Sequence, residues 1–270
     1  MKKRVAVCGA CGRMGSTLIG LLNKDADLLL SVALESEMHS SINREILPGV
    51  KISSNWQGCE NKIDIIIDFT APVSTLKNLE FAHLNKIPIV IGTTGFSKEE
   101  KNKILEKSKS LPILFSPNMS PGVHLMMDVV EYAAKILSRD YEVEILETHH
   151  HNKKDAPSGT ALKLGEIICK VKNLKPESTF KFSRHNQTGP RNKDEIGIHA
   201  VRMGDIIGEH SVFFAGTGET IEITHRCLSR ESFAAGAILG AKFLLIQKSG
   251  MYEMKDVINW MKGENNVETK

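Results

Sequence analysis

The chain has 270 residues, of which 41% are hydrophobic and 25% are charged, and its formal net charge is +3. This is the composition of an ordinary globular protein with one large or two medium domains, and the small charge argues against a nucleic-acid or membrane partner. Five scattered cysteines without a recognisable secretory signal lead us to expect free thiols and a cytoplasmic protein. Cys8 and Cys11 form a C-x-x-C, but they lie in a glycine-rich turn, which explains them better than redox or zinc chemistry does.

Predicted strands and helices alternate over the first 120 residues. Short apolar runs rich in Val and Ile predict strands at 5–9, 28–34, 63–69, 87–93 and 111–116. Helical patterns lie between them at 14–23, 73–85 and 98–110. Continuous apolar strands that alternate with helices are typical of a parallel sheet covered on both faces. The sequence therefore predicts a doubly wound α/β domain.

The pattern changes after residue 122. It predicts an amphipathic helix at 123–137, a strand at 141–149, a helix at 158–172, and strands at 196–202, 206–215 and 219–226. A glycine-containing turn at 216–219 favours a hairpin between the last two strands. Residues 231–246 and 251–261 return to a helical pattern. We therefore expect a second, smaller α+β unit dominated by a mainly open sheet.

A glycine-rich turn follows the first predicted strand. Gly9, Gly12 and Gly15 are spaced G-x-x-G-x-x-G and open the first helix. Without side chains at these positions, backbone N–H groups can approach a pyrophosphate at the helix N-terminus. Glu35 ends the second strand about 20 residues later, where an acidic side chain binds the ribose hydroxyls of a dinucleotide. A plain tight turn explains the glycines alone, but the combination predicts a nicotinamide dinucleotide site.

Glu35 also bears on the choice of cofactor. Its carboxylate would meet the 2′-phosphate of NADPH as a like charge, which is unfavourable unless it is compensated. Ser36 follows it, so no adjacent arginine is offered to that phosphate, and Arg13 in the turn compensates only in part. We therefore expect NADH to be preferred, without excluding NADPH.

Two further strand ends carry small or polar residues. Asp68-Phe69-Thr70 ends one predicted strand, and Gly92-Thr93-Thr94-Gly95 ends the next. Ligands of doubly wound sheets bind at the carboxyl ends of the strands. Ordinary turn chemistry explains either segment alone, but together with the glycine turn they predict contacts with the nicotinamide half of the cofactor.

The most unusual segment is E-T-H-H-H-N-K-K-D-A-P-S-G-T-A, residues 147–161. Its histidines and lysines lie at the end of a predicted strand and just after it. Ser158-Gly159-Thr160 then begins a predicted helix, whose N-terminal N–H groups and dipole favour an anion. Zinc binding is disfavoured because the side chains of consecutive histidines point in divergent directions. A solvated basic loop without a functional role remains an alternative. Because histidine titrates near neutral pH, we favour acid–base chemistry on an anionic substrate.

Together these motifs resemble the dihydrodipicolinate reductase family. The likeness is carried by residues 5–15, 68–70, 92–95, 147–161, 204–210 and 222–237 and runs through nearly the whole chain. It implies a Rossmann-type dinucleotide-binding domain formed by 1–120 with 231–270, a substrate-binding and oligomerisation domain over 121–230, and a homotetramer. It implies an enzyme of diaminopimelate and lysine biosynthesis. The reaction would be NAD(P)H-dependent reduction of 4-hydroxy-tetrahydrodipicolinate, via its dehydrated cyclic imine, to tetrahydrodipicolinate.

The resemblance also implies roles for single residues. His149 would be the proton donor or acceptor and Lys153 a proton donor, while His150, Gly159 and Thr160 would hold the substrate carboxylates. Met119 stands where relatives often have an aromatic residue, so apolar contact with the nicotinamide could persist but stacking could not. With the turn and strand ends above, the expected cofactor contacts are Gly9, Ala10, Cys11, Gly12, Arg13, Met14, Gly15, Glu35, Phe69, Thr70, Gly92, Thr93, Thr94, Ser116, Pro117, Asn118 and Met119.

Two rival functions remain open at this point. The first is a different dehydrogenase on the same scaffold, of the aspartate or homoserine type, and the D-A-P-S-G-T segment with its histidine cluster counts against it. The second is a non-catalytic protein that senses nicotinamide nucleotides. Such a protein would need the glycine turn but not Lys153 beside His149. No metal is expected in the site.

Overall fold

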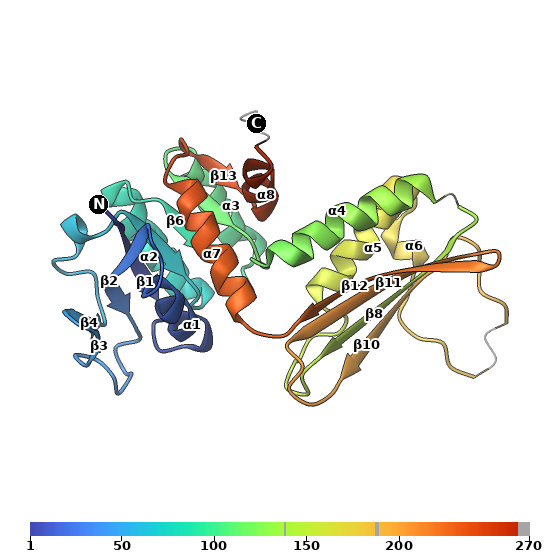
Figure 1. Ribbon diagram of the computed structural model, residues 1–270, viewed down its shortest axis with the longest axis horizontal. Coiled ribbons are helices and arrows are strands. Elements are labelled where there is room, and N and C mark those ends of the chain that lie inside the picture. The colour runs from blue at the N-terminus through green and yellow to red at the C-terminus, as the bar shows by residue number, and fades with distance from the viewer. Residues whose placement is uncertain (138, 187–188, 264–270) are drawn as a thin grey trace. The chain divides into compact units, whose positions relative to one another are not determined.

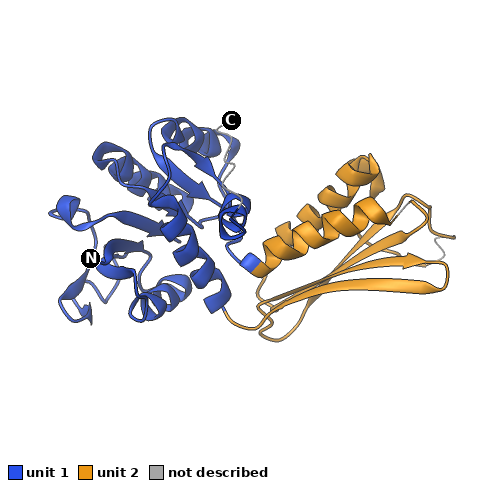
Figure 2. Cartoon of the chain, turned by 45° about the horizontal axis from the view of Figure 1, so that its top comes forward, with its two compact units in different colours: residues 1–121, 230–270 blue, residues 122–229 orange. Residues whose placement is uncertain are grey.

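The computed structural model describes residues 1–137, 139–186 and 189–263, and these form two compact units (Figure 2). Unit 1 comprises residues 1–121 together with the described part of 230–270, and unit 2 comprises residues 122–229. The chain therefore leaves unit 1 after its first part and returns to it near the end. In the described residues, no helix combines the length and apolar character needed to cross a bilayer.

Unit 1 is built on a sheet with the strand order β13-β7-β6-β5-β1-β2-β4-β3 (Figure 1). Its strands are β1 (Lys3–Cys8), β2 (Leu28–Leu34), β3 (Glu45–Leu47), β4 (Val50–Ser53), β5 (Ile65–Asp68), β6 (Ile89–Ile91), β7 (Pro112–Phe115) and β13 (Gly250–Tyr252). All neighbours pair in parallel except β3 with β4. The strand order reverses at β1, which lies between β2 and β5, and ligands bind at such a switch point.

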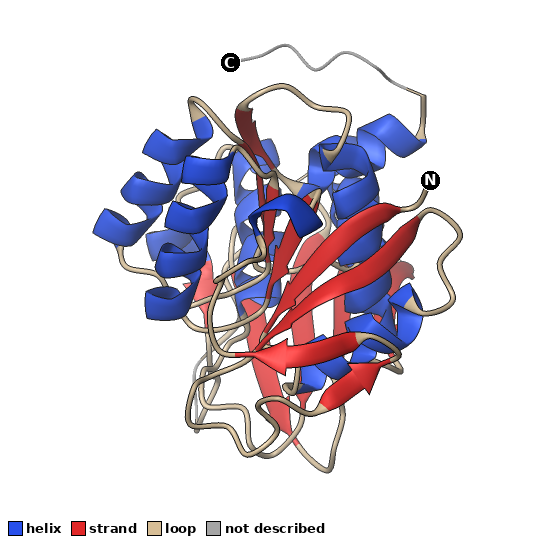
Figure 3. Cartoon of the chain, turned by 90° about the vertical axis from the view of Figure 1, so that its left-hand side faces the viewer, coloured by secondary structure: helices blue, strands red, loops and turns tan. Residues whose placement is uncertain are grey.

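Helices pack on both faces of this sheet (Figure 3). One core contains helices α1 (Arg13–Leu22), α7 (Glu231–Leu244) and α8 (Met254–Met261). The core on the other face contains α2 (Pro72–Asn85) and α3 (Lys98–Ser108). A short 3-10 helix, η1 (Glu60–Lys62), precedes β5. Ile65 and Ile67 of β5 point into the first core and Ile66 into the second. Because both faces are buried, the strand reads as a continuous apolar run. The prediction of a doubly wound parallel sheet is confirmed.

The short strands at the edges of this sheet differ from the prediction. Sequence patterns predict nothing regular at β3 and β4, and they predict a helix over 251–261. The structure instead has β13 at Gly250–Tyr252 and begins α8 at Met254, so the helical prediction is wrong for its first residues. Strands of three or four residues contain too few positions to show a period of two, and only their pairing identifies them.

Unit 2 contains a mixed sheet with the order β12-β11-β8-β10-β9. Its elements are α4 (Pro121–Ile136), β8 (Glu142–His149), α5 (Gly159–Lys172), α6 (Pro176–Thr179), β9 (Phe180–Lys181), β10 (Ile196–Arg202), β11 (Gly208–Gly216) and β12 (Glu219–Cys227). Strand β10 runs parallel to β8, whereas β11 is antiparallel to both β8 and β12. Helices α4 and α5 cover one face, where their apolar side chains pack on Val143, Ile145 and Phe214 (Figure 1). The predicted α+β unit is confirmed.

A glycine in α7 allows this helix to pack closely against the backbone of unit 1. A Cβ atom at Gly236 would lie 1.7 Å from the carbonyl oxygen of Met119. The helix can reach this distance only because position 236 has no side chain. Gly20 in α1 offers a contrast, because a Cβ there would meet no atom within 4 Å.

We predict that Gly236→Ala lowers the free energy of unfolding by about 1–3 kcal/mol, because the helix must shift to relieve the clash. Gly20→Ala should instead raise it by up to about 1 kcal/mol, because alanine favours an exposed helix more than glycine does. Urea denaturation followed by circular dichroism measures both. Equal effects of the two substitutions would contradict this account of how α7 packs.

Candidate active site

The glycine-rich turn joins β1 to α1 at the carboxyl end of the parallel sheet. Gly9 has a φ of +79°, which favours glycine, and a Cβ at Gly15 would lie 2.0 Å from the carbonyl oxygen of Gly9. Within the described chain, α1 has no side-chain cap and no acidic residue in its first turn. Its first N–H groups and the positive end of its dipole therefore suit an anion. The turn fits the pyrophosphate of a dinucleotide.

Glu35 reaches the same turn from the end of β2. Its Oε2 accepts a hydrogen bond from the Cys11 N–H at 2.9 Å, and its Oε1 accepts one from the Ser36 N–H at 2.8 Å. The side chain is only half-buried, so it retains contact with solvent. A carboxylate at the end of this strand, beside the turn, is where ribose hydroxyls are bound in dinucleotide-binding sheets.

A buried carboxylate joins the ends of β5 and β6. Asp68 accepts hydrogen bonds from the hydroxyls of Thr70 at 2.7 Å, Thr75 at 2.9 Å and Thr93 at 3.1 Å. The Asn78 amide donates to its other oxygen at 2.7 Å. The Thr70 and Thr93 hydroxyls thus contribute to the fold, and the Thr70 N–H belongs to the same network, since it donates to Asp68 and Thr93 at 3.0 Å.

The other predicted cofactor residues differ in exposure. A Cβ at Gly92 would lie 2.2 Å from the Phe69 ring, so the glycine makes room for the aromatic side chain. Thr94 and Pro117 are exposed, whereas the Met119 side chain is only 1% exposed and belongs to the core packed against α7. The Met119 side chain faces the core and is not available for the expected apolar contact with a nicotinamide. The cofactor role of each of these residues stays a prediction.

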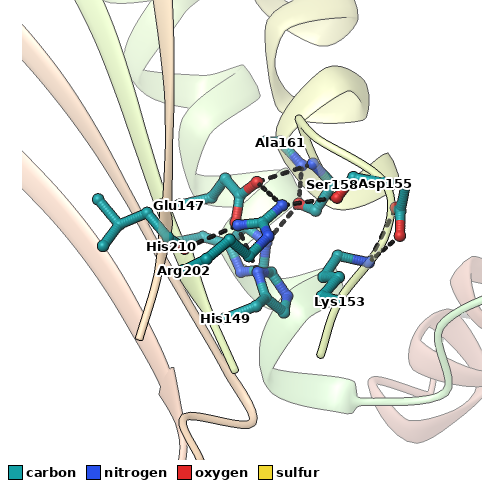
Figure 4. A network of polar contacts seen from close by, with 9 residues as sticks. Glu147, His149, Lys153, Asp155, Ser158, Ala161, Arg202 and His210 are labelled. Atoms are coloured by element: carbon teal, nitrogen blue, oxygen red, sulfur yellow. Dashed lines mark hydrogen bonds and ion pairs between the residues drawn. The ribbon is translucent and has the colours of Figure 1, made fainter. Parts of the chain in front are cut away.

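In unit 2 the histidine–lysine segment begins with a buried polar network (Figure 4). Glu147 is completely buried, and its Oε2 lies 2.6 Å from Nδ1 of His149. The Arg202 guanidinium donates to both carboxylate oxygens at 2.8 Å, and the Ser158 N–H donates to Oε1 at 3.0 Å. Burial raises the pKa of Glu147, but the hydrogen bonds from His149 and Arg202 outweigh it and hold that pKa at about 2. Glu147 is therefore ionised at neutral pH.

His210 of β11 is the buried neighbour of His149. The two rings meet edge to face with their centroids 5.2 Å apart. Nε2 of His210 lies 3.0 Å from Oγ of Ser158, which itself accepts the Ala161 N–H at 3.2 Å. Burial and the adjacent His149 lower the pKa of His210 to about 3, so it stays neutral across the physiological range.

Lys153 lies in the loop between β8 and α5, on the same side of the network as His149 (Figure 4). Its Nζ is 2.8 Å from both carboxylate oxygens of Asp155, which is itself largely exposed. His151 turns away and places Nδ1 2.8 Å from the Gly204 carbonyl oxygen. Among the described residues, no group of three or more His, Cys, Asp or Glu side chains is arranged to hold a metal ion.

The N-terminus of α5 completes the cluster. Ser158 caps the helix by accepting the Ala161 N–H, and the first turn contains no acidic residue in the described structure. Gly159 is exposed, and a Cβ there would meet no atom within 4 Å. An anion such as a substrate carboxylate can therefore approach this helix end.

Sequence patterns predict no role for Glu147, Arg202 or His210. A signal for the first is present in β8, where Glu147 follows Val143 and Ile145 at a spacing of two and so lies on the face that the helices cover. A carboxylate at a core position of a strand needs a partner. The sequence does not indicate which residue is that partner, because Arg202 lies on β10 and comes close to Glu147 only through the pairing of β10 with β8.

Comparisons with known proteins agree with this arrangement. The family described as "Dihydrodipicolinate reductase, N-terminus" matches residues 3–119, and "Dihydrodipicolinate reductase, C-terminus" matches residues 122–258. The 4-hydroxy-tetrahydrodipicolinate reductase of Geotalea uraniireducens (strain Rf4) is 43% identical over 262 residues, which cover 94% of this chain and 98% of the relative. The 4-hydroxy-tetrahydrodipicolinate reductase of Nitrosomonas europaea is 43% identical over 260 residues, which cover 94% of this chain and 97% of the relative.

Solved structures give the same relationship. A dipicolinate-bound dihydrodipicolinate reductase from Paenisporosarcina sp. TG-14 has a TM-score of 0.76 and 26% identity, covering 94% of this chain and 98% of that one. The diaminopimelate dehydrogenase of C. glutamicum has a TM-score of 0.55 at 14% identity and thus shares the fold alone. Because both family matches together span nearly the whole chain, this chain belongs to the dihydrodipicolinate reductase family.

Proposed function

We propose that this chain reduces 4-hydroxy-tetrahydrodipicolinate, via its dehydrated cyclic imine, to tetrahydrodipicolinate in diaminopimelate and lysine biosynthesis. The names of its relatives support this reaction. The structural observation that carries it is the grouping of His149, Lys153 and the N-terminus of α5 at the carboxyl end of β8 (Figure 4). This grouping combines a titratable base, a cation and an anion site, which is what a dicarboxylate that must be protonated requires.

The cofactor is a pyridine nucleotide, and unit 1 provides its site. The glycine turn from Gly9 to Gly15 would hold the pyrophosphate, and Glu35 would bind the adenosine ribose. When bound, the nicotinamide supplies a hydride to the substrate ring. We propose that NADH is preferred over NADPH, because the carboxylate of Glu35 would repel a 2′-phosphate and Ser36 offers that phosphate no positive charge.

The residues of unit 2 would bind the substrate and supply its proton. His150, Gly159 and Thr160 would hold the two carboxylates, with the dipole of α5 favouring their negative charge. Reduction of the conjugated imine moves negative charge towards the ring nitrogen. The Lys153 ammonium or a protonated His149 would stabilise that charge and donate the proton.

We further propose that unit 2 assembles the chain into a cytoplasmic homotetramer. Helices α4 and α5 cover one face of its sheet, and Leu146 of β8 alternates with the buried Ile145 and Glu147, so it lies on the opposite face with 36% exposure. Burial of this face between subunits would remove apolar surface from water. The free thiols of the described cysteines fit a reducing compartment.

We predict that His149→Ala and Lys153→Ala each lower kcat by roughly 10²–10³, because each removes a preorganised proton donor. Thr160→Val should mainly raise the substrate KM, because it alters a carboxylate contact and leaves the proton donors in place. The assay couples cofactor oxidation to dihydrodipicolinate synthase supplied with pyruvate and aspartate semialdehyde. Lys154→Ala, next to Lys153, is the matched control and should retain wild-type turnover. Near-normal kcat in both of the first two variants would refute their roles.

Cofactor preference is tested by kcat/KM with each nucleotide. We expect a higher kcat/KM with NADH, and we expect Ser36→Arg to raise kcat/KM with NADPH roughly tenfold, which corresponds to about 1.4 kcal/mol from a new arginine–phosphate contact. Met38→Arg adds the same charge two residues further on, at a side chain that is 94% exposed, and serves as a control for added charge alone. A clear wild-type preference for NADPH would overturn the proposal.

The assembly is tested by light scattering on the purified chain. We expect a mass of four chains, and we expect Leu146→Asp to reduce it, because a charge would be buried at the interface. Leu228→Asp introduces the same charge at a leucine that is 87% exposed and should leave the mass unchanged. A monomeric wild-type protein would exclude the homotetramer.

A further inference from the structure

We propose that Glu147 is a positioning residue that holds His149 with its proton on Nδ1, so that Nε2 is the atom that exchanges protons with the substrate. In the same proposal, Arg202 is a second positioning residue, which offsets the Glu147 charge and so limits how strongly His149 holds a proton. The exchange with substrate rests on the proposed function. The tautomer and the charge balance are properties of the chain itself and can be measured without turnover.

The tautomer follows from the hydrogen bonds that Glu147 receives. Three of its contacts come from groups that can only donate, namely the two Arg202 nitrogens and the Ser158 N–H. A guanidinium that donates to both oxygens and a backbone N–H that donates to one of them favour the ionised carboxylate. Glu147 is therefore an ion that only accepts, as its low pKa also indicates. The fourth contact, to Nδ1 of His149 at 2.6 Å, must then be donated by the imidazole.

With Nδ1–H held by Glu147, Nε2 is the nitrogen left for chemistry. A Cβ at Gly208 would lie 3.0 Å from Nε2 of His149, so the absence of a side chain at that position leaves space beside this atom. A neutral His149 can accept a proton at Nε2, and its protonated form can donate the same proton from there. The proton that His149 gains and loses is therefore always the one on Nε2, while the proton on Nδ1 stays bound to Glu147.

The charge balance involves the groups around His149. Glu147 is on its own strand, Arg202 comes from β10, and His210 from β11, while Lys153 and Asp155 come from the loop that follows β8. His210 is neutral because burial keeps its pKa near 3, and Lys153 is paired with Asp155. Glu147 therefore acts on the His149 ring through a direct contact, and Arg202 acts on it through the carboxylate of Glu147.

The two charges should act in opposite directions. Glu147 favours the imidazolium form of His149, and Arg202 opposes it by neutralising the same carboxylate. Opposite shifts would show that both charges act on His149, and the tautomer of His149 with the pH profile of kcat/KM separates positioning from packing.

The first measurement is nitrogen-15 histidine NMR of the full chain without substrate, with the His149 signals assigned by their loss in His149→Ala. Above the pH at which His149 is half protonated, we expect Nδ1 to carry the hydrogen and Nε2 to be bare. Glu147→Gln should admit the opposite tautomer, because its amide N–H can face Nδ1. A wild-type His149 that is mainly Nε2–H would overturn the proposal.

The second measurement is the pH of half-protonation of His149 in variants of each charge. Glu147→Gln should lower it and Arg202→Met should raise it, each by about one pH unit or more, since nearby charges shift titrations by that amount. Arg202→Lys, which retains the charge, should move it less than Arg202→Met does. Shifts of the same sign in the first two variants, or no shift in either, would overturn the charge balance.

The alkaline limb of the kcat/KM profile, where a proton donor loses its proton, should move in the same direction as the half-protonation pH of His149 in each variant. If Glu147→Gln does not fold, the wild-type tautomer and the Arg202→Met titration still decide the proposal. An Nδ1–H tautomer in a chain without reductase activity would count against the proposed reaction but not against the positioning. Reductase activity together with an Nε2–H tautomer would refute the positioning and leave the reaction standing.

Discussion

The site in unit 2 depends on one buried ion, the carboxylate of Glu147. A buried charge without partners costs several kcal/mol, so its surroundings must supply donors. They come from three elements: His149 at the end of β8, Arg202 at the end of β10, and the Ser158 N–H at the start of α5. Satisfying this single ion therefore fixes a strand end, a neighbouring strand and a helix start relative to one another. The proposed acid–base group and the proposed anion site are thus positioned by the same contacts.

Unit 1 uses a buried carboxylate in a similar place for a different purpose. Asp68 ends β5 and receives hydrogen bonds from neutral donors, the hydroxyls of Thr75 and Thr93 and the amide of Asn78. These donors do not change charge near neutral pH, so the network holds the strand ends without coupling them to protonation. The donors of Glu147 include an arginine and a titratable histidine. Of these two networks, the one around Glu147 is therefore the one that can connect the geometry of the site to the proposed proton transfer.

Local patterns were sufficient for most of the architecture. The alternation of apolar runs with helices predicted the doubly wound sheet, and the glycine turn and histidine–lysine segment indicated the family. The network around Glu147 could not be predicted in the same way, because Glu147 and Arg202 are 55 residues apart and meet only through strand pairing. The burial of Met119 was missed for the same reason, since it depends on α7, which folds back from the end of the chain. Sequence periodicity reports which face a residue occupies, not which distant element covers it.

Stability alone does not account for the Glu147–Arg202 pair. Buried ion pairs can often be replaced by well-packed apolar residues with no loss of stability, and Glu147 already occupies the face of β8 that Val143 and Ile145 fill with apolar side chains. An apolar residue at 147 could extend that core, but it could not accept the Nδ1 proton of His149. It would also leave the guanidinium of Arg202 without its carboxylate, near an imidazole that the proposed reaction requires to take up and release a proton. The proposed chemistry of His149 therefore explains the ion pair better than the packing of the sheet does.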